Sequence, residues 1–290
     1  MLSLRQIRRR IKSVENTKKM THAMEMVAAA KLKKLQDLLK QSDRYTGELK
    51  RILGTLVKEK PLAHPLLEKR GEVKSILAFL IASDTGLCGS YNTNIFEQAT
   101  RFLQAEGSTK QPVRFVTLGR QAAAFLKRRK QTVTKELNIP KPQEIEQTVR
   151  DAAQIATTEF QSGQADQVVF IYTKVFSLGS TKPVLGQLFP IVSGAKTTDD
   201  TKIVDYIIEP SLPKILEVIL PEFIEAEVSQ FIKNALVAEQ AARMMAMRQA
   251  TDNAEEMIES LTLARNKARQ ASITKELIEV VSGSRALQMK

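Results

Sequence analysis

The chain has 290 residues, of which 43% are hydrophobic and 26% are charged, a composition that excludes a disordered protein and indicates a globular one. Aromatic residues make up only 5% and tryptophan is missing, which favours long helices over a β-sandwich or β-barrel. A single cysteine excludes an internal disulfide and suits a reducing compartment. No apolar run reaches the ~18–20 residues of a membrane span, and we expect no secretion signal.

The formal charge of +12 is concentrated at the start of the chain. Residues 1–60 hold 16 Lys/Arg against 6 Asp/Glu, a net of +10, whereas residues 61–210 carry +3 and residues 211–290 carry −1. Such a basic segment binds nucleic acid or anionic lipid, or faces an acidic protein surface.

The first segment, residues 1–60, is predicted to be one long helix. It contains no proline, and Pro61 and Pro65 end it. Spacings of three and four indicate an apolar stripe on that helix. The stripe comprises Leu4, Ile7, Ile11, Val14, Met20, Met24 and Val27, and later Leu32, Leu35, Leu38 and Leu39.

A second long helix is predicted in residues 211–290. Pro213 and Pro221 mark a start and a break, and neither proline nor glycine follows until Gly283. The helix carries an alanine-rich stripe that lets a partner helix approach closely. Its members are Val228, Phe231, Ala235, Ala238, Ala242 and Met245, with Ala254, Met257 and Leu261 in a shifted phase.

The lengths of these helices determine the architecture. Helices of about 55 and 65 residues are roughly 80 and 100 Å long, whereas a compact chain of this size has a radius of gyration of about 19 Å. We therefore predict that the N- and C-terminal helices form an antiparallel coiled-coil shaft, which protrudes from a central domain in residues 61–210.

The central domain is predicted to be a Rossmann-like open α/β sheet, because strand and helix patterns alternate. The expected strands are "SILAFLIAS", "VRFVTLG", "QVVFIYTKVF" and "IVDYIIEPS", and "SLGSTKPVLGQLFPIVSG" could add a hairpin at the edge. The expected helices are "NTNIFEQATRFLQAEG", "RQAAAFLKRR" and "PQEIEQTVRDAAQIATTEFQSG".

The stretch "IASDTGLCGSYNTN", residues 81–94, stands where open α/β sheets bind ligands. Its glycines fit neither GxGxxG nor a P-loop, and the only histidines, His22 and His64, lie outside the central domain. Cys88 therefore lacks a base, which favours a tight turn with a buried thiol over a catalytic loop. Two isolated histidines and one cysteine provide no metal cluster.

Four motifs in four regions resemble the gamma subunit of the rotary ATP synthase, and the resemblance covers essentially the whole chain. They are "TKKMTHAMEMVAAAKL", "SDTGLCGSYNTN", "AARMMAMRQATDNA" and "NKARQASITKELIEVVSG". The resemblance implies a non-catalytic central rotor shaft that transmits rotation of the membrane c ring to the catalytic beta subunits. It implies three alpha and three beta subunits, the epsilon subunit and the c ring as partners, with no cofactor, metal, nucleic acid or substrate of its own.

Matching positions imply the partner contacts. The resemblance places Lys19, Thr21 and Met24 near the lever loops of the beta subunits, and Tyr206 and Glu209 on the c ring. It assigns to the alpha/beta ring Arg243, Arg269, Gln270 and Thr274, together with the tip from Val280 to Leu287.

Two departures and one gap qualify the resemblance. His22 stands where the family usually has lysine, and Ser90–Tyr91 replaces a more usual Gly-Leu. The cysteine-bearing insertion of plant relatives is missing from "LFPIVSGAKTTDDTKIVDY". Asp84 and the glycines of the 81–94 stretch are expected to touch the coiled coil.

The expected location is peripheral, on the cytoplasmic face of a bacterial plasma membrane, with a trimmed mitochondrial chain as the alternative. Two rival functions stay open at this point. One is a coiled coil that binds nucleic acid through its basic N-terminal helix, and the other is a small enzyme centred on Cys88.

Overall fold

A computed structural model describes residues 4–59, 64–68, 71, 73–108, 111–177, 180–191 and 211–288. The chain forms two compact units: residues 1–28 with 243–290, and residues 29–242. The first unit is helical, and the second contains the sheet. The predicted combination of a central α/β domain with two long antiparallel helices is confirmed.

Helix α1 (Leu4–Glu59) buries one seam whose positions alternate strictly by three and four residues. Buried or half-buried side chains recur at 4, 7, 11, 14, 18, 21, 25, 28, 32, 35 and 39. Between Val14 and Ala28 the seam passes through Lys18, Thr21 and Glu25. The predicted stripe was wrong at Met20 and Val27, which are 64% and 55% exposed. A repeat of 3.5 residues per turn keeps one face against the partner even where that face is polar.

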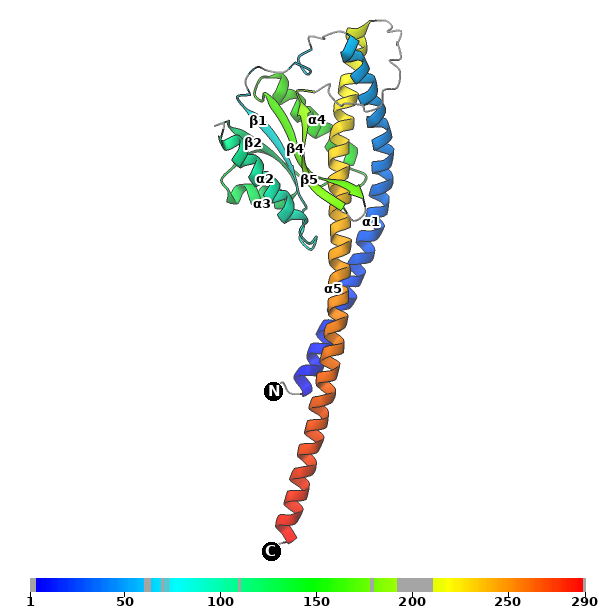
Figure 1. Cartoon of the computed structure of the whole chain (residues 1–290), viewed down its shortest axis with the longest axis vertical. Coiled ribbons are helices and arrows are strands. Elements are labelled where there is room, and N and C mark those ends of the chain that lie inside the picture. Colours follow the sequence, from blue (N-terminus) through cyan, green and yellow to red (C-terminus); the bar gives the residue numbers. More distant parts are fainter. Residues whose placement is uncertain are drawn as a thin grey trace. The chain divides into compact units, whose positions relative to one another are not determined.

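Helix α5 (Leu212–Gln288) is 77 residues long and includes Pro221, where the sequence predicted a break. Proline leaves the carbonyl of residue 217 without its helical donor. Because Pro221 lies on an exposed face, water can satisfy that carbonyl and the helix continues. In the sheet-containing unit, α5 lies between the sheet and α1, so nearly every side chain from 223 to 241 is buried (Figure 1).

The sheet contains five strands in the order β3-β2-β1-β4-β5. β1 (Ile76–Ile81), β2 (Val113–Leu118), β3 (Thr132–Leu137) and β4 (Gln167–Ser177) are parallel. β5 (Ser180–Phe189) pairs antiparallel with β4, which confirms the edge hairpin. β3 was not predicted, because "TVTKEL" is a largely exposed edge strand without an apolar run. The expected strand "IVDYIIEPS" lies almost wholly outside the described residues.

Helices α2 (Tyr91–Ser108) and α3 (Arg120–Arg128) cover one face of the sheet (Figure 1). The core on this face combines alternate residues of β1 with apolar residues of both helices, including Ile95, Phe102 and Leu126. All six residues of β1 are buried, as expected for a central parallel strand covered on both faces.

The other face of the sheet packs against α4 (Ile145–Gln161) and α5 through aromatic rings. Phe79 stacks on Phe170 at 4.3 Å between centroids, and Phe231 of α5 lies 4.9 Å from both Phe170 and Tyr172. Gly186 of β5 faces the same ring, and a Cβ there would lie 2.8 Å from Phe231. The ring of Phe231 thus ties α5 to the middle of the sheet.

Candidate functional site

The helical unit is held together by few buried side chains. Ile7 and Ile11 of α1 and Met247 and Ala254 of α5 are buried. Polar contacts also join the helices: the Thr251 hydroxyl donates to the Thr21 hydroxyl at 2.8 Å, and Lys18 Nζ lies 2.7 Å from Glu255 Oε1. Since the side chains of Lys18 and Glu255 are 35% and 58% exposed, this ion pair contributes at most about 1 kcal/mol.

The C-terminal part of α5 continues beyond the N-terminal end of α1 (Figure 1). Every described side chain from 269 to 284 is exposed. Large apolar residues are among them, at 50% exposure or more: Ile273, Leu277, Ile278, Val280 and Val281. A helix of this kind has its apolar surface available to another protein.

Most of the predicted ring contacts lie on exposed or half-exposed positions of the helical unit. Lys19, Arg269, Gln270, Thr274 and Val280 are exposed, and Met24 and Arg243 are half-buried. The side chain of Leu287 and the whole of Tyr206 and Glu209 lie outside the part of the chain that the structure describes.

Thr21 differs from the other predicted contacts. Its hydroxyl accepts from Thr251 and donates to the carbonyl of Lys18 at 3.1 Å. The Thr274 hydroxyl likewise donates to the carbonyl of Gln270 at 2.9 Å. Thr21 therefore helps to join α1 to α5.

Sequence reasoning did not single out several exposed apolar side chains of the helical unit as contact candidates, among them Met26, Met257 and Leu263, which are 59%, 51% and 64% exposed. The signal of Met257 was misleading, because a periodicity of three and four places apolar residues on a stripe without showing which stripe meets the partner helix.

The 83–90 loop leaves β1 and enters α2, and its contacts are internal. Ser83 N donates to Asn92 Oδ1 at 3.1 Å, and the Ser83 hydroxyl donates to the carbonyl of Thr85 at 2.7 Å. The Cys88 thiol is 2% exposed and lies 3.4 Å from Asn92 Nδ2. Serine and amide groups cannot serve as its base, so the contacts favour a packing role.

The loop touches α5 through Cys88 and Tyr91. Both side chains pack on Ala238, and the Tyr91 hydroxyl donates to the carbonyl of Ala235 at 3.3 Å. Asp84 contacts α3. Asp84 Oδ1 accepts from the backbone N–H of Arg120 at 3.0 Å and so caps α3, because its short side chain lies beside a helix N-terminus.

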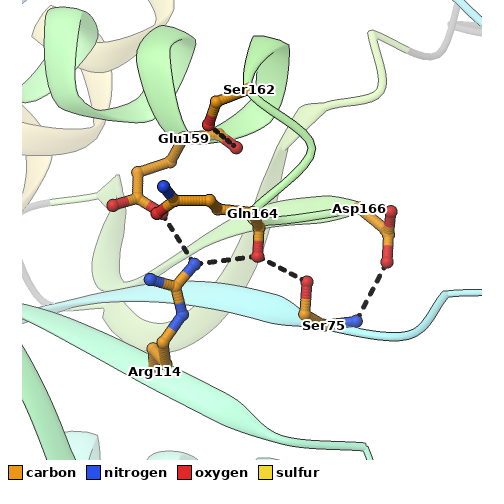
Figure 2. Close-up of polar contacts among 6 residues, drawn as sticks. All are labelled: Ser75, Arg114, Glu159, Ser162, Gln164 and Asp166. Carbon is orange, nitrogen blue, oxygen red and sulfur yellow. Dashed lines mark hydrogen bonds and ion pairs between the residues drawn. The ribbon is translucent and has the colours of Figure 1, made fainter.

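A polar cluster closes the opposite, amino-terminal end of the strands (Figure 2). Arg114 Nη2 donates to Glu159 Oε2 at 2.6 Å and to the carbonyl of Gln164 at 2.8 Å. The Ser75 hydroxyl donates to the same carbonyl at 2.6 Å, and its N–H donates to Asp166 Oδ2 at 3.0 Å. These bonds join the α4–β4 turn to β1 and β2, so the cluster stabilises the fold.

The described residues hold no group of three His, Cys, Asp or Glu side chains arranged for a metal ion. None of the described helices combines the length and apolarity needed to cross a membrane.

Comparisons with known proteins show the family to which the chain belongs. A family model described as ATP synthase matches residues 3–287. The ATP synthase gamma chain of Chloroherpeton thalassium is 38% identical over 99% of both chains. That of Dehalococcoides mccartyi is 38% identical over 99% of this chain and 100% of its own.

Solved structures share the fold. The rotor of the Euglena gracilis mitochondrial ATP synthase matches with a TM-score of 0.62 at 18% identity, over 93% of this chain and 98% of that one. The central stalk and c ring of the Tetrahymena thermophila enzyme matches with a TM-score of 0.59 at 23% identity, over 80% and 99%.

An open α/β sheet packed on two long helices, with a family model that spans almost the whole chain, defines a subunit of ATP synthase. Within that class, the chain belongs to the ATP synthase gamma-chain family.

Proposed function

We propose that this chain is the central rotor shaft of an ATP synthase. It transmits rotation of the membrane c ring to three catalytic beta subunits during ATP synthesis, and it transmits torque the other way when ATP hydrolysis drives proton pumping. The chain is itself non-catalytic; it works by presenting an asymmetric surface to its partners. Gamma-chain membership along the whole sequence supports this function.

The observation that carries the proposal is the exposed C-terminal part of α5. Its apolar side chains, from Ile273 to Val281, have no cover among the described residues of the helical unit. Small and branched apolar groups make contacts without fixed direction, so such a tip can turn inside a sleeve without being held at one angle. We assign residues 269–288 to the sleeve formed by the alpha and beta subunits.

Further contacts extend this assignment. Lys19 and Met24 face the lever loops of the beta subunits, and Thr21 supports them by holding α1 against α5. Arg243, Arg269, Gln270 and Thr274 provide polar contacts with the beta subunits, and Val280 and Leu287 belong to the tip. Tyr206 and Glu209 rest on the polar loops of the c ring, beside the epsilon subunit.

The positive charge of α1 supports a contact between the helical unit and the acidic loops of the beta subunits. Arg5, Arg8, Arg9 and Arg10 are all exposed on α1, at the start of the strongly basic segment. Exposed charge attraction tolerates changes of position, which suits three identical acidic loops that meet one shaft in turn. We place residues 1–60 and 211–290 in the shaft, residues 61–210 in the domain at its foot, and the complex on the cytoplasmic face of a bacterial membrane.

Reconstitution tests the proposal. The full chain is combined with alpha and beta subunits of a bacterial ATP synthase, and a variant ending at residue 272 is combined in parallel. We expect a complex of one copy with three alpha and three beta subunits in both cases, and weaker torque in the truncated one. A chain that stays alone in the presence of those subunits would refute the proposal.

A further inference from the structure

Glu227 is a buried carboxylate in the N-terminal quarter of α5. Only 7% of its surface is exposed, and its neighbours Ala226 and Val228 are buried as well. Lys50 of α1 places Nζ 2.7 Å from Glu227 Oε1. The ion pair therefore crosses the α1–α5 seam of the sheet-containing unit, with Glu227 buried and the side chain of Lys50 43% exposed.

A third element faces the same carboxylate. Lys174 of β4 lies near enough to lower the pKa of Glu227. Burial, with a further contribution from the charge of Glu227, raises the pKa of Tyr172, also on β4, to about 12. Helix α1 and strand β4 thus each bring a lysine close to the carboxylate of Glu227 on α5.

The Lys50–Glu227 pair is expected to add little to the stability of the folded chain. Burial raises the pKa of Glu227, and Lys50 and Lys174 offset only part of that effect. The charged form of Glu227 is therefore less favourable here than in water. Replacing a buried ion pair with well-packed apolar residues of similar volume is often neutral or stabilising, and the best-attested use of such buried polar or charged groups is to select one register.

The surrounding seam needs a device of that kind. Leu49, Leu53 and Leu56 of α1 are buried, and so are Leu220 and Phe223 of α5. A seam spaced by three and four residues repeats itself after seven, so sliding by one heptad restores much of its apolar contact. Apolar burial has no preferred direction, whereas an ion pair made at one site is lost on sliding.

We propose that Lys50 and Glu227 are positioning residues that fix the register of α1 against α5 under torque. The inference rests on the proposed shaft function, because only a loaded shaft needs to resist sliding of its helices. Two contacts nearby, from the Tyr45 hydroxyl to Glu222 Oε2 at 3.2 Å and from Gln230 Nε2 to Asp43 Oδ1 at 2.7 Å, are exposed. They have no buried charged member like Glu227 and therefore resist sliding less.

The first test measures register in the full chain alone. Spin labels are placed on exposed positions through Arg44→Cys and Glu225→Cys in a Cys88→Ser background, and the distance between them is measured. The unmutated pair is expected to give one distance. Glu227→Gln is expected to add a population displaced by about one heptad, roughly 10 Å along the helix. Lys50→Arg, which keeps the charge, is expected to keep the single distance.

The second test measures coupling in the reconstituted membrane complex. With Glu227→Gln or Lys50→Gln, the ratio of protons pumped to ATP hydrolysed is expected to fall below that of the unmutated chain, because a slipped helix transmits less of the torque. The double variant is expected to lose no more than either single one, because both remove the same contact. Glu48→Gln is the matched control, since it breaks an ion pair with Arg51 that lies within α1, and it is expected to leave the ratio unchanged.

The outcomes separate the two proposals. A single label distance for Glu227→Gln, or an unchanged pumping ratio in a working complex, would overturn the register role and leave the shaft function standing. A complex in which even the unmutated chain supports hydrolysis without pumping would overturn the shaft function. A thermal midpoint for Glu227→Gln well below that of the unmutated chain would overturn the register role in favour of plain stabilisation.

Discussion

Gly186→Ala tests how tightly α5 is packed on the sheet. The new methyl carbon would lie 2.8 Å from Cε1 of Phe231 and 3.0 Å from Cε1 of Tyr172, and both belong to buried rings. Forcing one methyl into a packed core costs about 1–3 kcal/mol, and the lower entropy of the unfolded alanine chain returns about 0.4–1 kcal/mol. The net loss is about 1–2 kcal/mol, which lowers the thermal midpoint by roughly 2–8 °C.

Thermal unfolding of the full chain, followed by circular dichroism, measures that loss. Gly54→Ala is the matched control, because a Cβ at Gly54 of α1 meets no atom within 4 Å. It is expected to stabilise the chain by about 0.5–1 kcal/mol through helix propensity. Phe231→Leu in the Gly186→Ala background should recover part of the loss, since the smaller side chain makes room for the methyl. A Gly186→Ala midpoint at or above that of the unmutated chain would refute the packing.

Three further changes test the loop and the buried carboxylate. Asp84→Ala removes the acceptor of the Arg120 N–H and should cost about 0.5–2 kcal/mol in the free energy of unfolding; an unchanged denaturation midpoint would contradict the cap. Cys88→Ser should lower stability by about 1 kcal/mol and leave the ATPase rate of the reconstituted complex unchanged, whereas a lost rate would revive a catalytic thiol. Burial raises the pKa of Glu227, so the folded state binds a proton on this carboxylate more readily than the unfolded state does. The contribution of Glu227 to the free energy of unfolding is therefore favourable below about pH 4.5 and is lost as pH rises. Glu227→Gln should therefore gain in thermal midpoint relative to the unmutated chain from pH 4.5 towards neutrality, and a flat difference would contradict the assigned burial.

The helices and most of the sheet could be predicted because their signals are local. Proline-free segments with a helical period define α1 and most of α5, and continuous apolar runs define β1 and β4. β3 was missed because an exposed edge strand such as Thr132–Leu137 has no apolar run to mark it. Pro221 was misread because its effect on a helix depends on whether the freed carbonyl meets water.

The contacts between helices could not be predicted, because they depend on register. Thr21 looks like a surface residue in the sequence, and only the position of Thr251 opposite it explains why it lies in the seam. Met20 and Val27 fit a helical stripe but lie outside that seam. Glu227 likewise resembles the other carboxylates of α5 until Lys50 is seen 2.7 Å away. The apolar period of a sequence shows which residues share one face of a helix, whereas only the structure shows which residues of the other helix lie against that face.

The central claim is that this chain turns inside a ring of catalytic subunits, and a rotation measurement tests it most directly. The complex with alpha and beta subunits is fixed to a surface through the beta subunits, and a bead is attached to the exposed face of α3 through Arg128→Cys. On addition of ATP, the shaft function predicts sustained rotation in one direction that stops when ATP is removed. A bead that only fluctuates about one angle while the complex hydrolyses ATP would contradict it.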